Sequence, residues 1–372
     1  MKVLASLALA ATAACGGGLQ TPPPLASTAL PDGSQLSPYD PAQPGQARPQ
    51  GMAAAAGRVY ITLSNQRDTA NLPVNAGPGF LAALVPSTGQ ITKVDLGGSD
   101  GRQCQNPGVV RASADGKLYV SCSGDFSGAD SARAIVEVDP ATNKMTRRAA
   151  IPDGLVPNGV AVTATRIWTG DTGSSRIFSI DRASFTAAAA EPIPLDCPKT
   201  DKTGFTYTPD VIAAGSDIYA LCASDIAGAI YRLDGATGAI KGQTAVGAGP
   251  TELTALDDGR IAVVNFLDNT LSLVTATASG ALTSTTALTF SSQTSGLQDV
   301  RAVGHILFTV ASGSNTAQRI DLDAQGGPRV VSEANFGAGA GPWNILPLDA
   351  VQAIVTNRGT NTVAAARWVD VK

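Results

Sequence analysis

The sequence predicts an all-β protein, a seven-bladed β-propeller whose four-stranded antiparallel blades surround a central channel. Seven short β-rich runs recur along the 372-residue chain at spacings of 43 to 59 residues, enough for four short strands per repeat. The runs are flanked by turns that contain Gly or Asp, and no segment has the 3.6-residue hydrophobic period of a helix. Repeats of this length favour a closed ring over an open solenoid.

The seven runs align on one column of mostly large apolar residues. They span residues 58–65, 117–124, 166–173, 217–224, 260–267, 305–312 and 352–359. The shared column holds Tyr60, Tyr119, Trp168, Tyr219, Ala262, Leu307 and Ile354. Both faces of a propeller blade pack against neighbouring blades, so near-continuous apolar strands are expected in this column.

The last repeat resembles the YVTN-type propeller repeat. Ile354-Val355-Thr356-Asn357 is similar to the Tyr-Val-Thr-Asn strand of that repeat, and Asn361-Thr362-Val363 is similar to the segment that follows it. Val263-Val264-Asn265 with Asn269-Thr270-Leu271 is a looser copy. The resemblance implies the propeller fold and says little about function.

The last repeat also lacks an outer strand of its own. Its third predicted strand runs to the end of the sequence, so the ring closes only if the outer strand of that blade comes from elsewhere. We expect this strand upstream of Gly51, near residues 35–39, although Pro38 and Pro41 restrict that segment to the edge of a sheet.

The first 50 residues predict export and a membrane anchor. Residues 1–14 combine Lys2 with a short apolar run, which is typical of a signal peptide and too short to span a bilayer. The run ends in Thr12-Ala13-Ala14-Cys15, which resembles a bacterial lipobox and implies lipidation of Cys15. Residues 15–50 hold eight of the 23 prolines and predict an extended tether, so the propeller domain is expected at residues 51–372. The alternative is an ordinary signal peptide cut near Ala14.

Composition and charge narrow the class of partner. The 26 Lys and Arg against 30 Asp and Glu give a net charge of −4, which argues against nucleic acid because that needs a clustered basic face. The single histidine, His305, rules out most metal sites built from several imidazoles.

We expect a monomer that is held at the membrane by its lipid anchor and binds a protein or a small molecule. Gly16 after the cysteine favours the outer membrane of a bacterial cell envelope, on its periplasmic or its outer surface.

The four cysteines beyond Cys15 predict two disulfide bonds. Cys122 and Cys222 each follow a column tyrosine by three residues, and Cys104 and Cys197 each precede the innermost strand of the same repeats. A Cys122–Cys222 bond would join repeats two apart in the ring, farther than the Cα separation of about 6 Å that a disulfide allows. The pairs Cys104–Cys122 and Cys197–Cys222 are therefore expected, and an exported protein is the setting in which they persist. The alternative is four buried free thiols.

Both predicted disulfides lie on one face of the ring, which we call the stapled face. Loops that enter the innermost strands and loops that leave the second strands meet there, including the long loops at residues 64–78 and 123–132. The opposite face, which we call the plain face, carries short turns such as residues 140–144 and 235–238. Binding residues concentrate on long loops fixed to a rigid scaffold, so we expect recognition on the stapled face.

Polar side chains at the start of the innermost strands are expected to ring the channel at its stapled end. The candidate ligand-binding residues are Asn106, Asn158, Asp210, Glu252, Asp299 and Asn344. Asn106, Asn158 and Asp210 are spaced 52 residues apart and so fall on three consecutive blades, where their oxygens suit a hard divalent ion such as Ca²⁺. The alternative is that these side chains only satisfy backbone groups in local turns.

This set is similar to the metal site of the SMP-30/gluconolactonase family. The resemblance implies that Asn106, Asn158 and Asp210 hold a metal ion that polarises a lactone carbonyl and activates water. The family adds a Glu from the first blade, whereas residues 50–54 of this chain contain none. The leading interpretation is therefore a non-catalytic protein that binds a partner or ligand on the stapled face, and the alternative is a metal-dependent, lactonase-like hydrolase.

Overall fold

A computed structural model describes residues 28–29, 46–67, 74–98, 102–124, 132–187, 191–198, 206–277, 280–291 and 294–368. These residues form β-strands and turns, and no helix occurs among them. The described part of the chain accordingly has no helix that could span a membrane.

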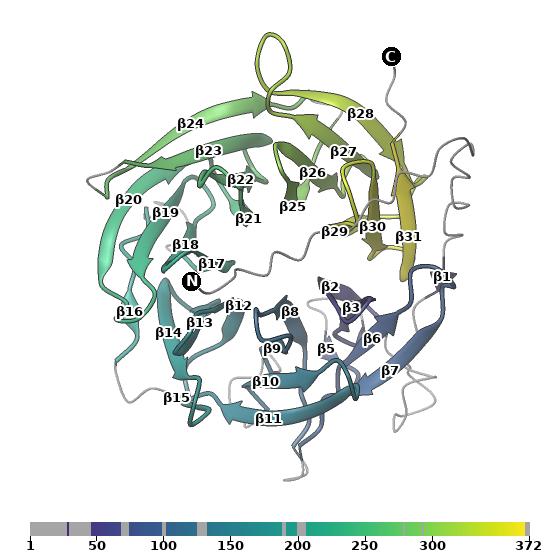
Figure 1. Cartoon of the computed structure of the whole chain (residues 1–372), viewed down its shortest axis with the longest axis vertical. Helices are drawn as coiled ribbons and strands as arrows, with labels where there is room; N and C mark the ends of the chain where they lie inside the picture. Colours follow the sequence, from purple (N-terminus) through teal and green to yellow (C-terminus); the bar gives the residue numbers. More distant parts are fainter. Residues whose placement is uncertain are drawn as a thin grey trace, which may run out of the picture.

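Seven antiparallel sheets stand around a central channel, and the chain runs once around the ring in sequence order (Figure 1). The innermost strands of consecutive blades contact one another, and the innermost strand of blade 7 contacts that of blade 1. The predicted seven-bladed propeller is confirmed.

Each blade presents its first strand to the channel and its last strand to the outside. The innermost strands are β2 (Pro49–Ala55), β8 (Pro107–Ala112), β12 (Pro157–Val162), β17 (Val211–Ala214), β21 (Pro250–Ala255), β25 (Leu297–Val303) and β29 (Pro342–Pro347). The second strands are β3 (Arg58–Leu63), β9 (Leu118–Cys122), β13 (Arg166–Asp171), β18 (Asp217–Ala223), β22 (Ile261–Asn265), β26 (Ile306–Ala311) and β30 (Gln352–Asn357). The third strands are β6 (Phe80–Leu84), β10 (Ala134–Asp139), β14 (Arg176–Asp181), β19 (Gly228–Asp234), β23 (Thr270–Ala276), β27 (Thr316–Asp321) and β31 (Thr362–Arg367).

The outermost strands complete the blades. They are β7 (Ile91–Asp95), β11 (Lys144–Ala150), the pair β15 (Thr186–Ala187) and β16 (Ile193–Pro194), β20 (Ile240–Val246), β24 (Leu282–Thr289), β28 (Arg329–Asn335) and β1 (Thr28–Ala29). A small additional hairpin, β4 (Gln66–Arg67) with β5 (Val74–Asn75), projects from the loop between β3 and β6.

The second strands form the packed interior of the ring. Every residue of the aligned column, from Tyr60 to Ile354, is buried. Two aromatic side chains of this column donate hydrogen bonds to the next blade: Tyr60 Oη to the carbonyl of Pro140 and Trp168 Nε1 to that of Gly235. The column therefore correctly predicts apolar packing on both faces of each second strand.

The ring closes through a strand from upstream of the propeller, as expected, at a different position. β1 pairs antiparallel with β31, with Thr28 opposite Val363 and Ala29 opposite Thr362. Residues 35–39, the expected site of this strand, lie outside the described residues. β1 falls in a stretch without proline, between Pro24 and Pro31, where every backbone N–H is available to the ladder.

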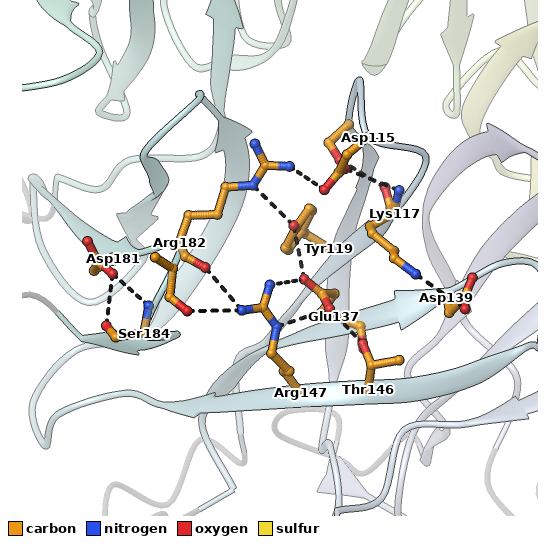
Figure 2. A network of polar contacts seen from close by, with 12 residues as sticks. Asp115, Lys117, Tyr119, Glu137, Asp139, Thr146, Arg147, Asp181, Arg182 and Ser184 are labelled. Atoms are coloured by element: carbon orange, nitrogen blue, oxygen red, sulfur yellow. Dashed lines mark hydrogen bonds and ion pairs between the residues drawn. The ribbon is translucent and has the colours of Figure 1, made fainter.

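A network of charged and polar side chains joins blades 2 and 3 near the plain face (Figure 2). Arg147 on β11 pairs with Glu137 on β10 and also donates to the backbone carbonyl of Arg182 in blade 3. Arg182 in turn contacts Asp115 at 2.5 Å and donates to the hydroxyl of Tyr119. Burial alone would raise the pKa of Glu137, but hydrogen bonds from Arg147 and its neighbours outweigh it and hold that pKa below its usual value. All these groups have protein partners, so the network is structural.

Candidate functional site

Two disulfide bonds brace the stapled face, with the pairing that the sequence predicts. Cys104 and Cys122 bond within blade 2 at a Cα separation of 5.3 Å, and Cys197 and Cys222 bond within blade 4 at 5.5 Å. Each bond ties the loop that enters an innermost strand to the end of the second strand of the same blade. Disulfides of this kind persist in oxidising compartments, which indicates an extracytoplasmic location.

Polar residues in the same column as the stapling cysteines fix the ends of other second strands. Asp171 accepts from the backbone N–H groups of Val156 and Gly173, and Arg176 pairs with it at 2.8 Å. Asn265 donates to Ser272 at 2.9 Å. These side chains hold the loops of the stapled face in place by hydrogen bonds where other blades use disulfides.

The two predicted asparagines at the channel entrance bond to different partners. Asn106 lies just before β8 and accepts a hydrogen bond from Gln66 Nε2 at 2.9 Å. Asn158 lies on β12 and donates to the carbonyl of Pro209 at 2.6 Å. Among the described residues no hydrogen bond or ion pair joins Asn106, Asn158 and Asp210 to one another.

The three predicted carboxylates instead form a chain of alternating charges with two arginines. Arg111 on β8 reaches Asp210 at 2.7 Å and Glu252 at 2.8 Å. Arg301 on β25 reaches the same Glu252 oxygen at 2.9 Å and Asp299 at 3.3 Å. The chain therefore crosses the channel, because Arg111 belongs to blade 2 and its partners to blades 4 and 5.

Burial and neighbouring charges shift the pKa values of this cluster. Desolvation raises the pKa of Asp210 well above its ordinary value, since it outweighs the attraction of Arg111, and the nearby Glu252 raises it further. Desolvation likewise raises the pKa of Asp299, to about 6. Glu252, which both arginines contact, keeps a pKa below its ordinary value. Arg111 stays charged, because its carboxylate neighbours outweigh the desolvation and raise its pKa.

Asn344, the last predicted site residue, belongs to blade 7 and bonds within it. Its backbone N–H donates to Thr356 Oγ1 at 3.2 Å. Asp299 reaches the neighbouring residue, accepting from the N–H of Ile345 at 2.9 Å. This contact ties blade 6 to blade 7 at the channel wall.

The partners of the Asp210 carboxyl group are relevant to the predicted Ca²⁺ site. Asp210 Oδ1 is buried and accepts no hydrogen bond, which a cation or a proton on that carboxyl would satisfy. Desolvation raises the pKa of Asp210, which favours the protonated carboxyl, and Arg111 supplies a positive charge 2.7 Å from the other carboxyl oxygen. Among the described residues, no group of three or more His, Cys, Asp or Glu side chains is arranged to hold a metal. Arg111 thus compensates the charge of Asp210, and the Ca²⁺ site of Asn106, Asn158 and Asp210 stays a prediction.

Sequence reasoning missed Arg111 and Arg301, although the repeat holds a signal for them. Val110-Arg111-Ala112 and Val300-Arg301-Ala302 occupy the same place in β8 and β25. A cation at one channel-facing position in two repeats, with acidic residues at the starts of other innermost strands, predicts pairing across the channel.

The channel opens on the plain face into a cavity of about 450 Å³. Residues from the ends of all seven innermost strands line it, including Ala54, Val160, Leu253 and Leu346. Arg111 and Arg301 are its charged lining residues, so the cavity reaches the inner charge cluster.

The stapled face carries two hollows of its own. A groove of about 280 Å³ between blades 4 and 5 is lined by Tyr207, Phe266 and Leu267, with Asp225 as its one charged lining residue. Phe266 and Leu267 are 38% and 50% exposed, and the nearby Ile226 is 52% exposed. A second hollow, of about 380 Å³, lies where blades 6, 7 and 1 meet, and Trp343 stacks there with Arg358 at 4.3 Å from the ring centre.

His305, the single histidine, lies on the plain face in the turn between β25 and β26. Its ring contacts Asp323 at 2.6 Å, and this contact raises the histidine pKa. The ring is 41% exposed, as expected for a solvated turn.

Comparison with known proteins supports the propeller class and goes no further. No model of a known protein family matches the chain, and neither does any curated protein sequence. Among solved structures, a candidate 6-phosphogluconolactonase from Bacteroides fragilis aligns with a TM-score of 0.64 at 14% identity, covering 85% of this chain and 92% of that one. An inactive virginiamycin B lyase from Staphylococcus aureus with quinupristin aligns at 0.60 and 16%, covering 89% and 98%.

A third similar structure is a β-propeller domain by its own description. The Swd1 β-propeller domain from Myceliophthora thermophila aligns with a TM-score of 0.63 at 12% identity, covering 87% of this chain and 98% of that one. Likeness at such identities shows the shared fold alone, since one propeller scaffold serves many functions. The chain is a seven-bladed β-propeller protein with two intra-blade disulfides.

Proposed function

We propose that this protein is an exported, lipid-anchored propeller that binds a protein partner on its stapled face and carries out no reaction there. The observation that carries the proposal is the gathering of Ile226, Phe266 and Leu267, all exposed, on adjacent loops of that face. Exposed apolar side chains that gather beside a groove are typical of protein–protein interaction sites.

The groove also indicates the chemistry of the partner. Tyr207, Phe266 and Leu267 line the groove, and its volume is enough to hold one bulky apolar side chain of a partner. Asp225 on its rim makes no ion pair with any described residue. We therefore expect a partner segment that inserts an apolar side chain and places a Lys or Arg beside it.

The polar residues of the channel entrance support binding rather than catalysis. Asp210, Glu252 and Asp299 are held by Arg111 and Arg301, and Asn106 and Asn158 by neighbouring protein groups. Side chains committed in this way serve the scaffold, which keeps the loops of the stapled face in a fixed arrangement.

The N-terminal part of the proposal concerns the anchor. Cys15 would carry the lipid, the segment up to residue 50 would tether the propeller, and the protein would sit at the outer membrane. The disulfides support an oxidising compartment. Labelling with a fatty acid tests the anchor: the wild type is expected to incorporate label and fractionate with membranes, and Cys15→Ser to do neither.

A matched pair of variants tests the binding surface. Leu267→Asp places a charge in the groove, whereas Leu348→Asp places one at a leucine that is 45% exposed on the turn between β29 and β30, on the plain face. Crosslinking in the native envelope, followed by identification of the captured protein, should lose the partner in Leu267→Asp and keep it in Leu348→Asp. Equal capture by both folded variants would contradict the stapled face as the binding surface, as would undiminished capture after reduction of the disulfides in a protein that stays folded.

The hydrolase remains the second candidate and has its own test. It requires Ca²⁺ held by Asn106, Asn158 and Asp210. We expect no change in melting temperature between Ca²⁺ and EDTA and no hydrolysis of simple lactones. Ca²⁺-dependent lactone hydrolysis that is lost in Asp210→Asn would replace the binding proposal.

A further inference from the structure

The cavity on the plain face has the form of a small-molecule site. Its volume of about 450 Å³ falls in the range of ligand pockets, and its walls are mostly Ala, Val, Ile and Leu side chains from the innermost strands. Its polar lining residues are few: the guanidinium groups of Arg111 and Arg301, with the hydroxyl residues Ser113 and Thr254. Apolar walls with a small number of convergent polar groups are typical of a site that takes an organic ligand.

The two arginines keep donors for such a ligand. Every described contact of either guanidinium group uses its Nη2 nitrogen. Their Nε and Nη1 N–H groups therefore make no hydrogen bond with a described residue. Both Nη2 atoms contact the same oxygen of Glu252, at 2.8 and 2.9 Å, so the two guanidinium groups lie side by side.

The charge of the cluster limits what it can accept. Two arginines face three acids, Asp210, Glu252 and Asp299. Burial raises the pKa of Asp210 and Asp299, which reduces the negative charge that opposes the two arginines. Two guanidinium groups that already face three acids suit one additional negative charge at their free N–H donors, and a doubly charged phosphate would be left poorly compensated.

From these observations we infer that the plain-face cavity binds a small monocarboxylate with an apolar body, whose carboxylate accepts hydrogen bonds from Arg111 and Arg301. The apolar body would lie against the walls formed by residues such as Val160 and Leu253. This site lies at the opposite end of the channel from the proposed protein-binding groove, so each proposal can fail without the other.

Cyclohexanecarboxylate is a suitable probe, and cyclohexanecarboxamide, which has the same ring and no charge, is its control. Saturation-transfer NMR and titration should show saturable binding of the acid at pH 7.5, with the amide at least about tenfold weaker because it lacks the charge-assisted hydrogen bonds. Equal binding of acid and amide would overturn the carboxylate class, and absence of saturable binding of either would overturn the site.

Two variants locate the binding. Ala54→Trp fills the cavity from an exposed wall position and should abolish binding, whereas Ala141→Trp, at an exposed turn on the same face outside the cavity, should leave it unchanged. Arg301→Lys keeps the positive charge but loses the planar fork, and should weaken the acid about tenfold without affecting the amide. Melting curves confirm that each variant folds. Unchanged binding in folded Ala54→Trp would place the probe elsewhere and contradict the inference.

Discussion

The two faces of this propeller are built in different ways. The stapled face has long connections that are held by disulfides and by side chains such as Asp171 and Asn265, and it exposes apolar residues such as Leu267. The plain face has short turns, and its channel leads to buried charges that compensate one another, Arg111 and Glu252 among them. Disulfide bonds hold the exposed loops of the stapled face in a fixed arrangement. In the channel, ion pairs between arginines and carboxylates stabilise buried charges that a small ligand can reach from the plain face.

The largest effect is expected where the charge balance is broken. Arg111→Met leaves Asp210 and Glu252 buried without their shared cation, and we expect the free energy of unfolding to fall by about 3–5 kcal/mol. Chemical denaturation measures it. The double variant Arg111→Met with Asp210→Asn should recover part of the loss, because it removes one of the uncompensated acids. No recovery would mean that the arginine stabilises the protein by packing alone.

Loss of a disulfide is expected to have the next largest effect. Replacing both Cys104 and Cys122 by Ser removes a link between residues 18 apart, which should lower the free energy of unfolding by about 3 kcal/mol. Hydrogen exchange should increase in the loops of the stapled face and remain unchanged in the turns of the plain face. An increase that is equal on both faces would show that the disulfides stabilise the whole ring rather than one face.

The pH dependence of stability gives a smaller and more specific effect. The pKa of Asp299 is raised to about 6 in the folded protein, so the folded state binds this proton more tightly than the unfolded state. Its contribution to stability is therefore present below about pH 4 and is lost as the pH rises through about 6, by at most about 3 kcal/mol. Asp299→Asn should flatten the unfolding free energy over this interval. A variant with the same slope as the wild type would contradict this assignment.

The smallest effect is expected at His305 on the plain face. The pair with Asp323 is exposed, and its hydrogen bond raises the pKa of the histidine, so any stabilisation is present at low pH and lost as the pH rises through that value. His305→Gln should leave the free energy of unfolding almost unchanged, as expected for an exposed ion pair. A larger loss would show that the plain-face turns are coupled to the cluster inside the channel.

Structure could be predicted from sequence where a residue type at a given spacing is compatible with a single structural role. The aligned column of Tyr, Trp and aliphatic residues predicts the second strands, because only packed strands need that repeat. The spacing of the cysteines predicts both disulfides, since the closed ring leaves only intra-blade pairs within reach. These features depend on local spacing and on the number of blades.

The channel depends instead on contacts between distant repeats. Arg111 and Glu252 are 141 residues apart and meet only because the ring brings blades 2 and 5 to one axis. Nothing local to either residue indicates this pair. The position of β1 was missed for a similar reason, because a two-residue strand takes its partner from β31 and has almost no pattern of its own.

The central claim is that a protein partner binds on the stapled face. Hydrogen exchange, compared between the free protein and its complex with the partner that crosslinking identifies, tests this claim most directly. Binding on the stapled face predicts protection of residues 224–227 and 266–269, the loops that carry Ile226 and Leu267, and no protection of the turns at residues 113–117 and 348–351. Protection of those plain-face turns, with the stapled loops exchanging as in the free protein, would contradict the account.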